Sequence, residues 1–512
     1  MRVDVNNVKY SYTTMNSMLK DEVKKTLLEP VGEISDIVDR NRDTFIRISD
    51  ALWEFAETKY EEFQSSELLC ETLEQEGFLV ERGIAGMETA FVGTFGSGSP
   101  VLAILGEYDA LSGLSQSAST PERSPLVQGG NGHGCGHNLF GAGSLAGAVA
   151  LRRYMTQNHV QGTIRFYGCP AEEGGSGKAY MARAGVFDDV DVSLAWHPGT
   201  AHGVMITSTL ANSQVLFKFT GQSSHAAVNP HLGRSALDAV ELMNVGVNYL
   251  REHVRPNTRI SYAITDTGGT SPNVVQGQAA VLYLIRAPQI SEVNQVYERV
   301  CNVAKGAAMM TGTEVEIVFD KACSNLIPNN TLERIVYQTM VAIPVPEHDA
   351  NEHKLAQSFA ATLPQNAKAD EFRFLKGMGD EGQEAYEHLM DRELADVVLP
   401  YAATNFVAPV SSDVGDVSWI VPTVQFTTAC WTLGTPAHSW QAVSQGTTSV
   451  AHKGMLYAAK VLACTALEIL QNSEVAMAAR AELQKRLGNE TYVCPIPRDV
   501  KPPRASLSGL RV

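Results

Sequence analysis

The residues best suited to chemistry lie in one glycine-rich segment, NGHGCGHN. This segment places His133, Cys135 and His137 within five residues, with single glycines between them. Imidazole and thiolate groups are common ligands of divalent transition metals. A spacing of two does not fit one face of a helix but suits a tightly bent loop, which glycine permits. The segment predicts a metal-binding loop, and the alternative is a glycine-rich turn with incidental histidines.

A second candidate is the acidic pair Glu172 and Glu173, which directly follows a predicted strand and precedes GGSG. In an extended segment, neighbouring side chains point in opposite directions, so the two carboxylates can serve two roles. One would bind a metal ion, and the other would act as general base toward a metal-activated water. The alternative is a solvated acidic turn.

Three further polar residues, Asp109, His197 and His438, end or follow apolar runs. A lone histidine is usually a core or surface residue. However, the carboxyl ends of parallel strands share the sheet edge where α/β proteins form their sites. One thiolate, three imidazoles and one or two carboxylates are too many ligands for a single tetrahedral ion. They suit two divalent ions roughly 3.5–4 Å apart, a co-catalytic pair for hydrolysis.

The elements that must position these residues alternate between helical and apolar strand patterns. This alternation predicts an α/β domain with a mostly parallel central sheet. The predicted helical segments are 34–78 and 137–155, and the predicted strands are 101–111, 163–170 and 192–198.

From residue 213 the pattern becomes strand–helix–strand–strand–helix–strand, which predicts a ferredoxin-like α+β domain inserted into the α/β domain. The expected strands are 213–222, 259–265, 279–287 and 314–320, and the expected helices are 233–254 and 293–310. We expect an N-terminal extension (1–33), a first part of the α/β domain (34–212), the inserted domain (213–322), a second part of the α/β domain (323–490) and a C-terminal tail (491–512).

Composition excludes several function classes. The 512 residues carry 40 Lys+Arg against 56 Asp+Glu, and the resulting net charge of −16 disfavours nucleic-acid binding. The eight cysteines are scattered rather than arranged as a disulfide framework. The N-terminus shows no signal-peptide pattern, and no run reaches the roughly 18 apolar residues of a membrane span. We therefore expect a cytoplasmic protein without a membrane partner.

Taken together, the motifs resemble metallopeptidase family twenty, in its amidohydrolase branch, from about residue 35 to about residue 504. In order, they are GEYDALSGLSQ, GHGCGHNLFG, PAEEGGSGKAYM, WHP, TGQSSHAAVNPHLGRSALDAVEL and GTPAHSW. The resemblance implies two divalent metal ions per subunit, with Glu172 as general base and Asp109 orienting a ligand histidine. The metal ligands that it implies are Cys135, His137, Glu173, His197 and His438.

The resemblance leaves the metal open, because Glu107 stands where the wider family has a histidine. Cys135 favours zinc, whereas carboxylate ligands favour harder ions such as manganese. The resemblance also implies that the α/β domain is catalytic and that the inserted domain (213–322) is a dimerisation and lid domain. In the homodimer that it implies, His225 reaches the partner's active site and helps hold the developing oxyanion. Asn273 and Arg286 match positions that bind the substrate carbonyl and carboxylate. The resemblance also hints at a second subunit.

The expected function is hydrolysis of the amide bond in small N-acyl amino acids, above all aromatic acyl-glutamates such as aminobenzoyl-glutamate. One alternative is a dipeptidase or carboxypeptidase on the same scaffold. Another is a non-catalytic regulatory subunit, against which the full set of ligand residues argues. His133 is expected to be structural, whereas His159 and His452 are expected at the surface.

Overall fold

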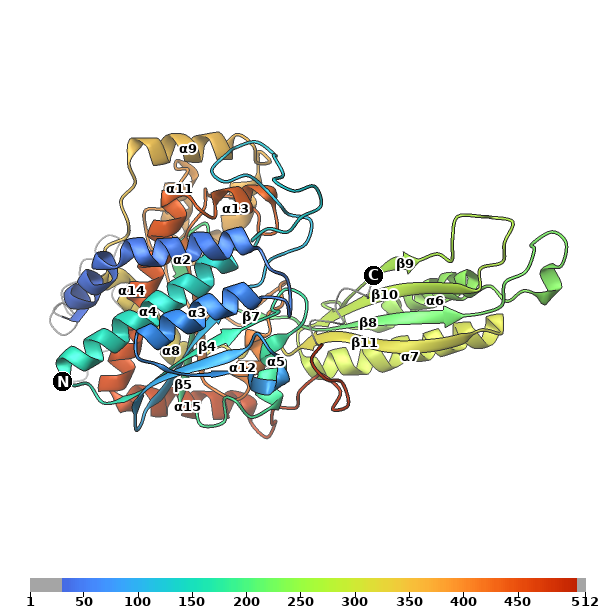
Figure 1. Ribbon diagram of the computed structural model, residues 1–512, viewed down its shortest axis with the longest axis horizontal. Coiled ribbons are helices and arrows are strands. Elements are labelled where there is room, and N and C mark those ends of the chain that lie inside the picture. Colours follow the sequence, from blue (N-terminus) through green and yellow to red (C-terminus); the bar gives the residue numbers. More distant parts are fainter. Residues whose placement is uncertain (1–29, 504–512) are drawn as a thin grey trace.

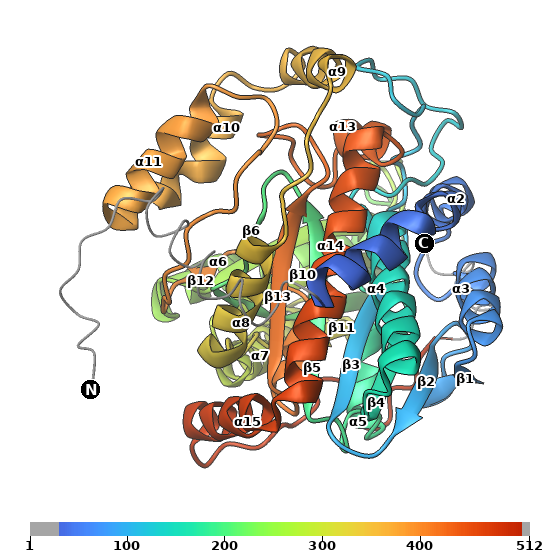
Figure 2. The same cartoon turned by 90° about the vertical axis from the view of Figure 1, so that its left-hand side faces the viewer.

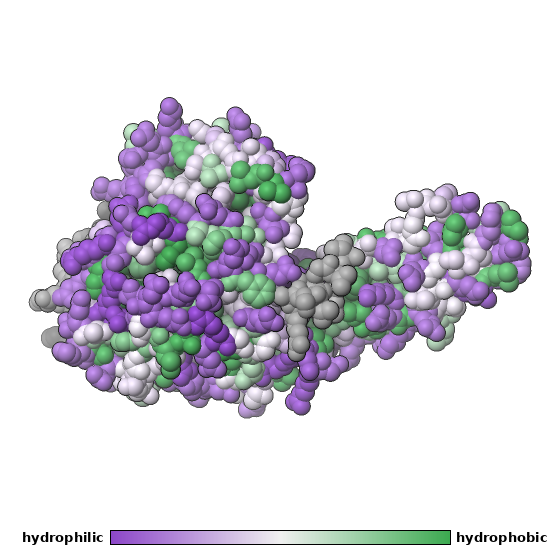
Figure 3. Space-filling model, in the orientation of Figure 1, coloured by the Kyte–Doolittle hydropathy of each residue, from purple (hydrophilic) through white to green (hydrophobic). Residues whose placement is uncertain are grey.

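The computed structural model describes residues 30–503 and contains two parts joined by a narrow waist (Figure 1). The larger part is built on a seven-stranded sheet, and an elongated lid carries a four-stranded sheet. Each sheet has its own hydrophobic core. The space-filling view shows a notch between the upper side of the larger part and the lid (Figure 3).

The seven-stranded sheet has the order β1-β2-β4-β3-β5-β13-β6. Its four middle strands, β4, β3, β5 and β13, are parallel, whereas β1, β2 and β6 pair antiparallel at the two sides. The prediction of a mostly parallel sheet is therefore confirmed. The strands are β1 (Leu79–Arg82), β2 (Phe91–Ser97), β3 (Val101–Glu107), β4 (Gly162–Cys169), β5 (Val192–Gly199), β6 (Gly203–Val204) and β13 (Thr423–Ala429).

Two buried helices, α4 (His137–Asn158) and α14 (Ser449–Gln471), pack against each other and cover one face of this sheet (Figure 2). Small residues allow the close approach, since a Cβ at Gly147 would lie 3.1 Å from the Ala459 carbonyl oxygen. In length and composition α14 could cross a membrane, but 83% of its most apolar window is buried inside the fold. This burial is that of a core helix.

The predicted helical stretch 34–78 forms three helices rather than one continuous element. Helix 30–40 is followed by α2 (Arg42–Phe55) and, after an extended connection, α3 (Phe63–Gln75). The remaining helices of the larger part are α5 (Gly177–Arg183), α8 (Asn330–Ala342), α9 (Ala350–Ala360), α10 (Ala367–Glu371), α11 (Gly379–Met390), α12 (Val414–Ser418), α13 (Trp440–Gln445) and α15 (Ser473–Leu487). A small parallel pair joins β7 (Ser208–Thr209) to β12 (Val407–Ala408).

The lid has the predicted ferredoxin-like order of elements. It comprises β8 (Ala211–Thr220), α6 (Ala236–Leu250), β9 (Arg259–Asp266), β10 (Gln278–Ala287), α7 (Ile290–Thr311) and β11 (Glu314–Cys323). The strand order is β11-β8-β10-β9, and every neighbouring pair is antiparallel. Alternate side chains of β8 and β10 are buried under α6 and α7, and the other face of the sheet is more open.

The chain after α15 packs across α5, where Arg183 donates hydrogen bonds to the carbonyl oxygens of Pro497 and Val500. The end of the predicted tail lies outside the described residues. Residues 1–29 of the predicted N-terminal extension also lie outside the described residues. The expectation of no signal peptide applies to that segment.

All eight cysteines are free thiols.

One buried histidine of the larger part makes stability depend on pH. His202 is fully buried, its Nδ1 accepts the Ala429 N–H at 3.2 Å, and its Nε2 has no partner. Burial, followed by the charge of His348, lowers its pKa from 6.5 to about 3. As the pH falls below 6.5, His202 binds a proton in the unfolded chain but stays neutral in the folded chain. The free energy of unfolding should therefore fall by up to about 1.4 kcal/mol per pH unit from this group.

The matched variant is His202→Asn, whose amide oxygen can still accept the Ala429 N–H. Chemical denaturation between pH 7 and pH 5 should show a shallower loss of stability in this variant than in the unmodified chain. Equal slopes would contradict the assignment.

Candidate metal centre

Cys135 lies at the centre of the candidate site. Its thiol forms one group with His137 and His197, and a second group with Glu173 and His438. Within each group the ligand atoms lie within 4.8 Å of one another. The structure thus brings all five expected metal ligands together, in two sets that share one sulfur atom.

Local backbone geometry explains why glycines surround Cys135. Gly136 has φ 73° and caps the start of α4, and a Cβ there would lie 2.8 Å from Trp431. A Cβ at Gly134 would lie 2.6 Å from Leu114, and its carbonyl accepts the His438 N–H at 2.8 Å. Larger residues would therefore push apart the loop that carries Cys135 and the loop that carries His438.

Hydrogen bonds fix the orientation of two of the expected ligand histidines. His137 Nδ1 lies 2.9 Å from Asp109 Oδ1, and His197 Nδ1 lies 2.7 Å from the Pro198 carbonyl oxygen. In the neutral imidazole each Nδ1 donates its proton to these acceptors, and Nε2 then keeps the lone pair that a metal ion requires. His197 Nε2 lies 3.5 Å from the Cys135 sulfur.

Glu173 connects the second set to the first. Its Oε1 lies 3.3 Å from His438 Nε2, and its backbone N–H donates to Asp109 Oδ2 at 2.9 Å. Asp109 therefore holds both His137 and the segment that carries Glu173. The acidic pair lies in a turn, not in the extended segment we expected from the sequence. The turn still directs the two carboxylates to different neighbours.

The charge distribution suits bound cations. His137 Nε2 lies 3.2 Å from Glu107 Oε2, so two acceptors face each other unless a proton or a metal ion lies between them. Burial is the largest effect on the Cys135 thiol and disfavours the thiolate, but the charge of His197 and the hydrogen bonds with His137 and His197 together outweigh it and lower the pKa of Cys135 to about 6. Burial likewise opposes the Glu173 carboxylate most strongly, yet the hydrogen bond to His438 and the charges of His137 and His438 together lower its pKa to about 2. Thiolate and carboxylate are the forms that bind metal.

Glu172 belongs to a neighbouring acidic group with Glu107 and His137, again within 4.8 Å. Burial, and then the charges of Glu107 and Glu173, raises the pKa of Glu172 well above its ordinary value. Glu172 is thus a carboxyl group that favours its protonated form and lies beside the metal ligands.

A buried ion cluster behind Glu172 was not predicted from the sequence. Lys178 is fully buried, and its Nζ lies 2.6 Å from both Glu107 Oε1 and Asp413 Oδ1. Its backbone N–H also donates to Asp413. A charged lysine of this kind needs paired carboxylates. The available signal was a lysine among the small and apolar residues of GKAYMA.

The three expected substrate-binding residues of the lid lie at its two opposite ends. His225 and Asn273 are exposed neighbours in loops beyond the far end of β8, which spans roughly 30 Å from its start at the waist. One chain therefore does not bring them to Cys135. Arg286 lies at the other end of the lid sheet, directly opposite Asn212. Of the remaining histidines, His133 is buried against the Leu52 carbonyl oxygen, as a structural residue would be.

The prediction for His452 was wrong. It is buried and lies 2.8 Å from Asp50 Oδ1, whereas His159 is exposed as expected.

Comparison with known proteins agrees with this architecture. Residues 103–335 match the model of peptidase family M20/M25/M40. The chain is 48% identical to one of the subunits of the p-aminobenzoyl-glutamate hydrolase of Escherichia coli, over 92% of this chain and 98% of that protein. It is 26% identical to the Xaa-Arg dipeptidase of Mus musculus, over 88% and 92% of the two chains.

Solved structures share the fold. An aminobenzoyl-glutamate utilization protein from Klebsiella pneumoniae aligns with a TM-score of 0.55 at 19% identity, covering 83% of this chain and 98% of its own. A dinuclear metal-binding peptidase of the same family from Bacillus subtilis aligns with a TM-score of 0.51 at 18% identity, covering 85% and 99%. The chain belongs to the M20 peptidase family and is a metal-dependent hydrolase acting on amide bonds.

Proposed function

We propose that this protein is a two-metal amidohydrolase that removes the acyl group from N-acyl amino acids, with aromatic acyl-glutamates such as p-aminobenzoyl-glutamate as its preferred substrates. The observation that carries the proposal is the pair of ligand sets sharing Cys135. The 48% identity to a component of an aminobenzoyl-glutamate hydrolase supports the substrate class.

Each ligand set would hold one divalent ion, either manganese or zinc. One ion would lie among Cys135, His137 and His197, and the other among Cys135, Glu173 and His438. When bound, such a pair polarises the scissile carbonyl and lowers the pKa of the attacking water. Asp109 keeps His137 in the tautomer that binds metal, because it accepts the Nδ1 proton.

Glu172 is proposed as the general base and then the general acid. It would take a proton from the attacking water and deliver it to the leaving amine nitrogen. Two cations bound nearby would favour the ionised form of Glu172 before the first step, and the burial of its carboxyl group would favour holding the proton between the two steps. Lys178 and Asp413 form the wall behind the acidic group and keep Glu107 in place.

We propose a homodimer in which the lid of a second copy supplies His225. The Nδ1 atom of His225 accepts the N–H groups of Ala227 and Val228 at 3.2 Å, so its proton resides on Nε2. An exposed imidazole in this tautomer can donate a hydrogen bond to a developing oxyanion. Asn273, beside His225, would bind the substrate carbonyl.

We also propose a separate partner protein in the assembly. The other component of the Escherichia coli p-aminobenzoyl-glutamate hydrolase is itself similar to this chain, at 31% identity over 48% of this chain and 59% of that protein. A hydrolase built from two related chains is therefore the arrangement that this likeness supports.

We propose a cytoplasmic location, since eight free thiols fit a reducing compartment.

A substrate panel tests the proposed activity. The metal-loaded protein should hydrolyse p-aminobenzoyl-glutamate with a kcat/KM at least a hundredfold above that for simple dipeptides, including an Xaa-Arg dipeptide. The dipeptide arm matters because of the likeness to Xaa-Arg dipeptidases. A preference for dipeptides would overturn the substrate class. No hydrolysis across a panel of acyl amino acids, with metal content verified, would favour a regulatory role.

A further inference from the structure

At the waist, the open face of the lid sheet contacts the backbone of the segment that carries Glu173. Lys321, in β11, donates from Nζ to the carbonyl oxygen of Glu173 at 2.8 Å. Lys321 is paired with Gln214 of β8, whose side chain lies on the face opposite the helices. Directly opposed residues of antiparallel strands point to the same face. Other side chains of this face, at the same end of the lid, therefore point toward the same space.

Two arginines occupy that end of the open face. Arg286 of β10 is directly opposite Asn212 of β8 on one side and Arg259 of β9 on the other. Directly opposed residues have Cβ atoms about 5 Å apart, and like charges in such a pair are destabilising. Sheet stability therefore does not explain why these two arginines lie opposite each other.

Neither arginine is neutralised within residues 30–503. Arg259 donates only to the carbonyl oxygens of Pro256 and Thr258, which fixes its guanidinium without balancing its charge. Arg286 makes no ion pair there, and its buried Nε has no hydrogen-bond partner. The buried Oδ1 of Asn212 is also unpartnered. Unpaired buried polar groups beside two unneutralised cations are typical of a site completed by a ligand.

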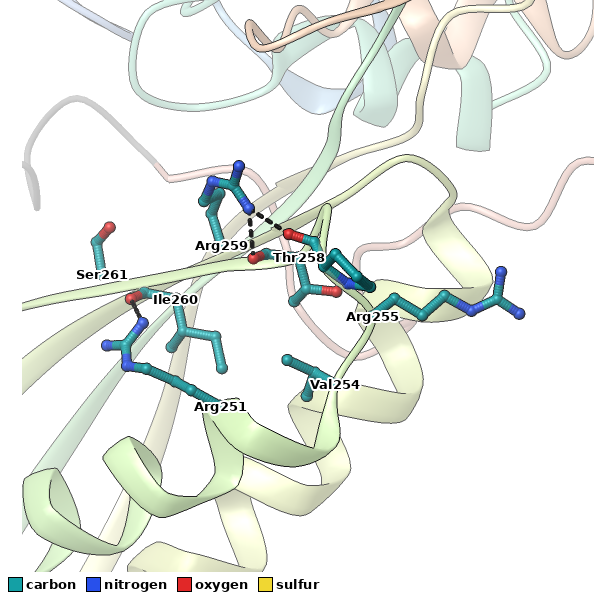
Figure 4. A pocket seen from close by; sticks show the side chains of 8 residues that line it. Arg251, Val254, Arg255, Thr258, Arg259, Ile260 and Ser261 are labelled. Atoms are coloured by element: carbon teal, nitrogen blue, oxygen red, sulfur yellow. Dashed lines mark hydrogen bonds between the residues drawn. The ribbon is translucent and has the colours of Figure 1, made fainter.

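Arg259 also lines a cavity of about 350 Å³ at the edge of the lid (Figure 4). The other charged side chains that line this cavity already have partners. Arg251 donates to the carbonyl oxygen of Ile260, and Arg255 points away from Arg259 and forms an ion pair with Glu292 at 2.9 Å. Arg259 is thus the arginine of this cavity that also lies directly opposite Arg286 in the sheet.

We propose that Arg259 and Arg286 together select a dicarboxylate amino acid, with the α-carboxylate on Arg286 and the side-chain carboxylate on Arg259. Guanidinium groups bind carboxylates through paired N–H donors, and two of them on adjacent strands match two carboxylates of one small molecule. This inference rests on the proposed hydrolysis of acyl amino acids and names the feature that selects glutamate. Arg259 is the new specificity-determining residue.

The test compares p-aminobenzoyl-glutamate with p-aminobenzoyl-glutamine, which lacks the side-chain charge. In the unmodified protein, kcat/KM should be at least tenfold higher for the glutamate substrate. In Arg259→Gln this ratio should fall at least tenfold, mainly through KM, and Arg259→Lys should restore part of it. Arg255→Gln is the matched control and should change the ratio less than twofold, because Arg255 is already paired with Glu292.

A binding measurement makes the test independent of turnover. By isothermal titration calorimetry, glutarate should bind Arg259→Gln at least tenfold more weakly than it binds the unmodified protein or Arg255→Gln. If acyl-glutamate and acyl-glutamine are hydrolysed equally well, the inference fails and the proposed function stands. If no acyl amino acid is hydrolysed, the proposed function fails. If Arg259→Gln alters the oligomeric state and leaves the substrate ratio intact, the arginine row belongs to an interface and the inference is wrong.

Discussion

Substitution of Glu172 with glutamine should lower kcat about a thousandfold while leaving the metal content unchanged. The loss is expected because general acid–base groups contribute typically 10²–10⁴-fold, and glutamine can neither accept nor return the proton. The metal content is expected to stay because neither ligand set that shares Cys135 includes Glu172. Steady-state kinetics and elemental analysis of the same preparation measure both quantities.

The control for this substitution is Glu71→Gln, which makes the same chemical change on an exposed face of α3. It should alter neither kcat nor metal content. If Glu172→Gln strips the metal while Glu173→Gln retains it, the roles of the two carboxylates are the reverse of those proposed.

Substitution of Cys135 with serine should remove both metal ions, because its sulfur belongs to both ligand sets. Loss of a ligand should weaken the binding of each ion by more than the 10–100-fold that is typical of losing a hydrogen-bond partner of a ligand. His438→Gln should retain about one ion per chain, since His438 belongs to one set only. Elemental analysis after dialysis distinguishes these outcomes.

The matched control is Cys70→Ser, which changes a buried cysteine of α3 and should keep two ions per chain. If Cys135→Ser still holds two ions, the sulfur is not shared. Removal of metal should also lower the thermal midpoint of the unmodified protein, since bound ions stabilise the folded state. A chelator should lower the thermal midpoint of the Cys135→Ser variant only slightly.

Much of the fold was predictable because its central strands carry an unambiguous pattern. β3, β4 and β5 are mainly apolar and almost entirely buried, as expected for strands covered on both faces. The antiparallel strands β1 and β2 were missed because one has four residues and the other contains two glycines. Such strands form because the neighbouring strand offers pairing groups, which a local pattern does not reveal.

The site was only partly predictable from residues near each other in sequence. His133, Cys135 and His137 drew attention to one loop, but the contact between Glu173 and His438 joins positions 265 residues apart. Only the resemblance to a known family connected them beforehand. The cluster of Lys178 with Glu107 and Asp413 was missed for the same reason. A buried ion pair depends on a partner that tertiary structure supplies.

The most direct test of the shared thiolate is anomalous diffraction from crystals of the metal-loaded protein. The account predicts two metal peaks per chain, both within bonding distance of the Cys135 sulfur, which is about 2.3 Å for zinc. One peak should lie beside His137 and His197, and the other beside Glu173 and His438. A single peak, or two peaks of which one lies away from Cys135, would contradict the account.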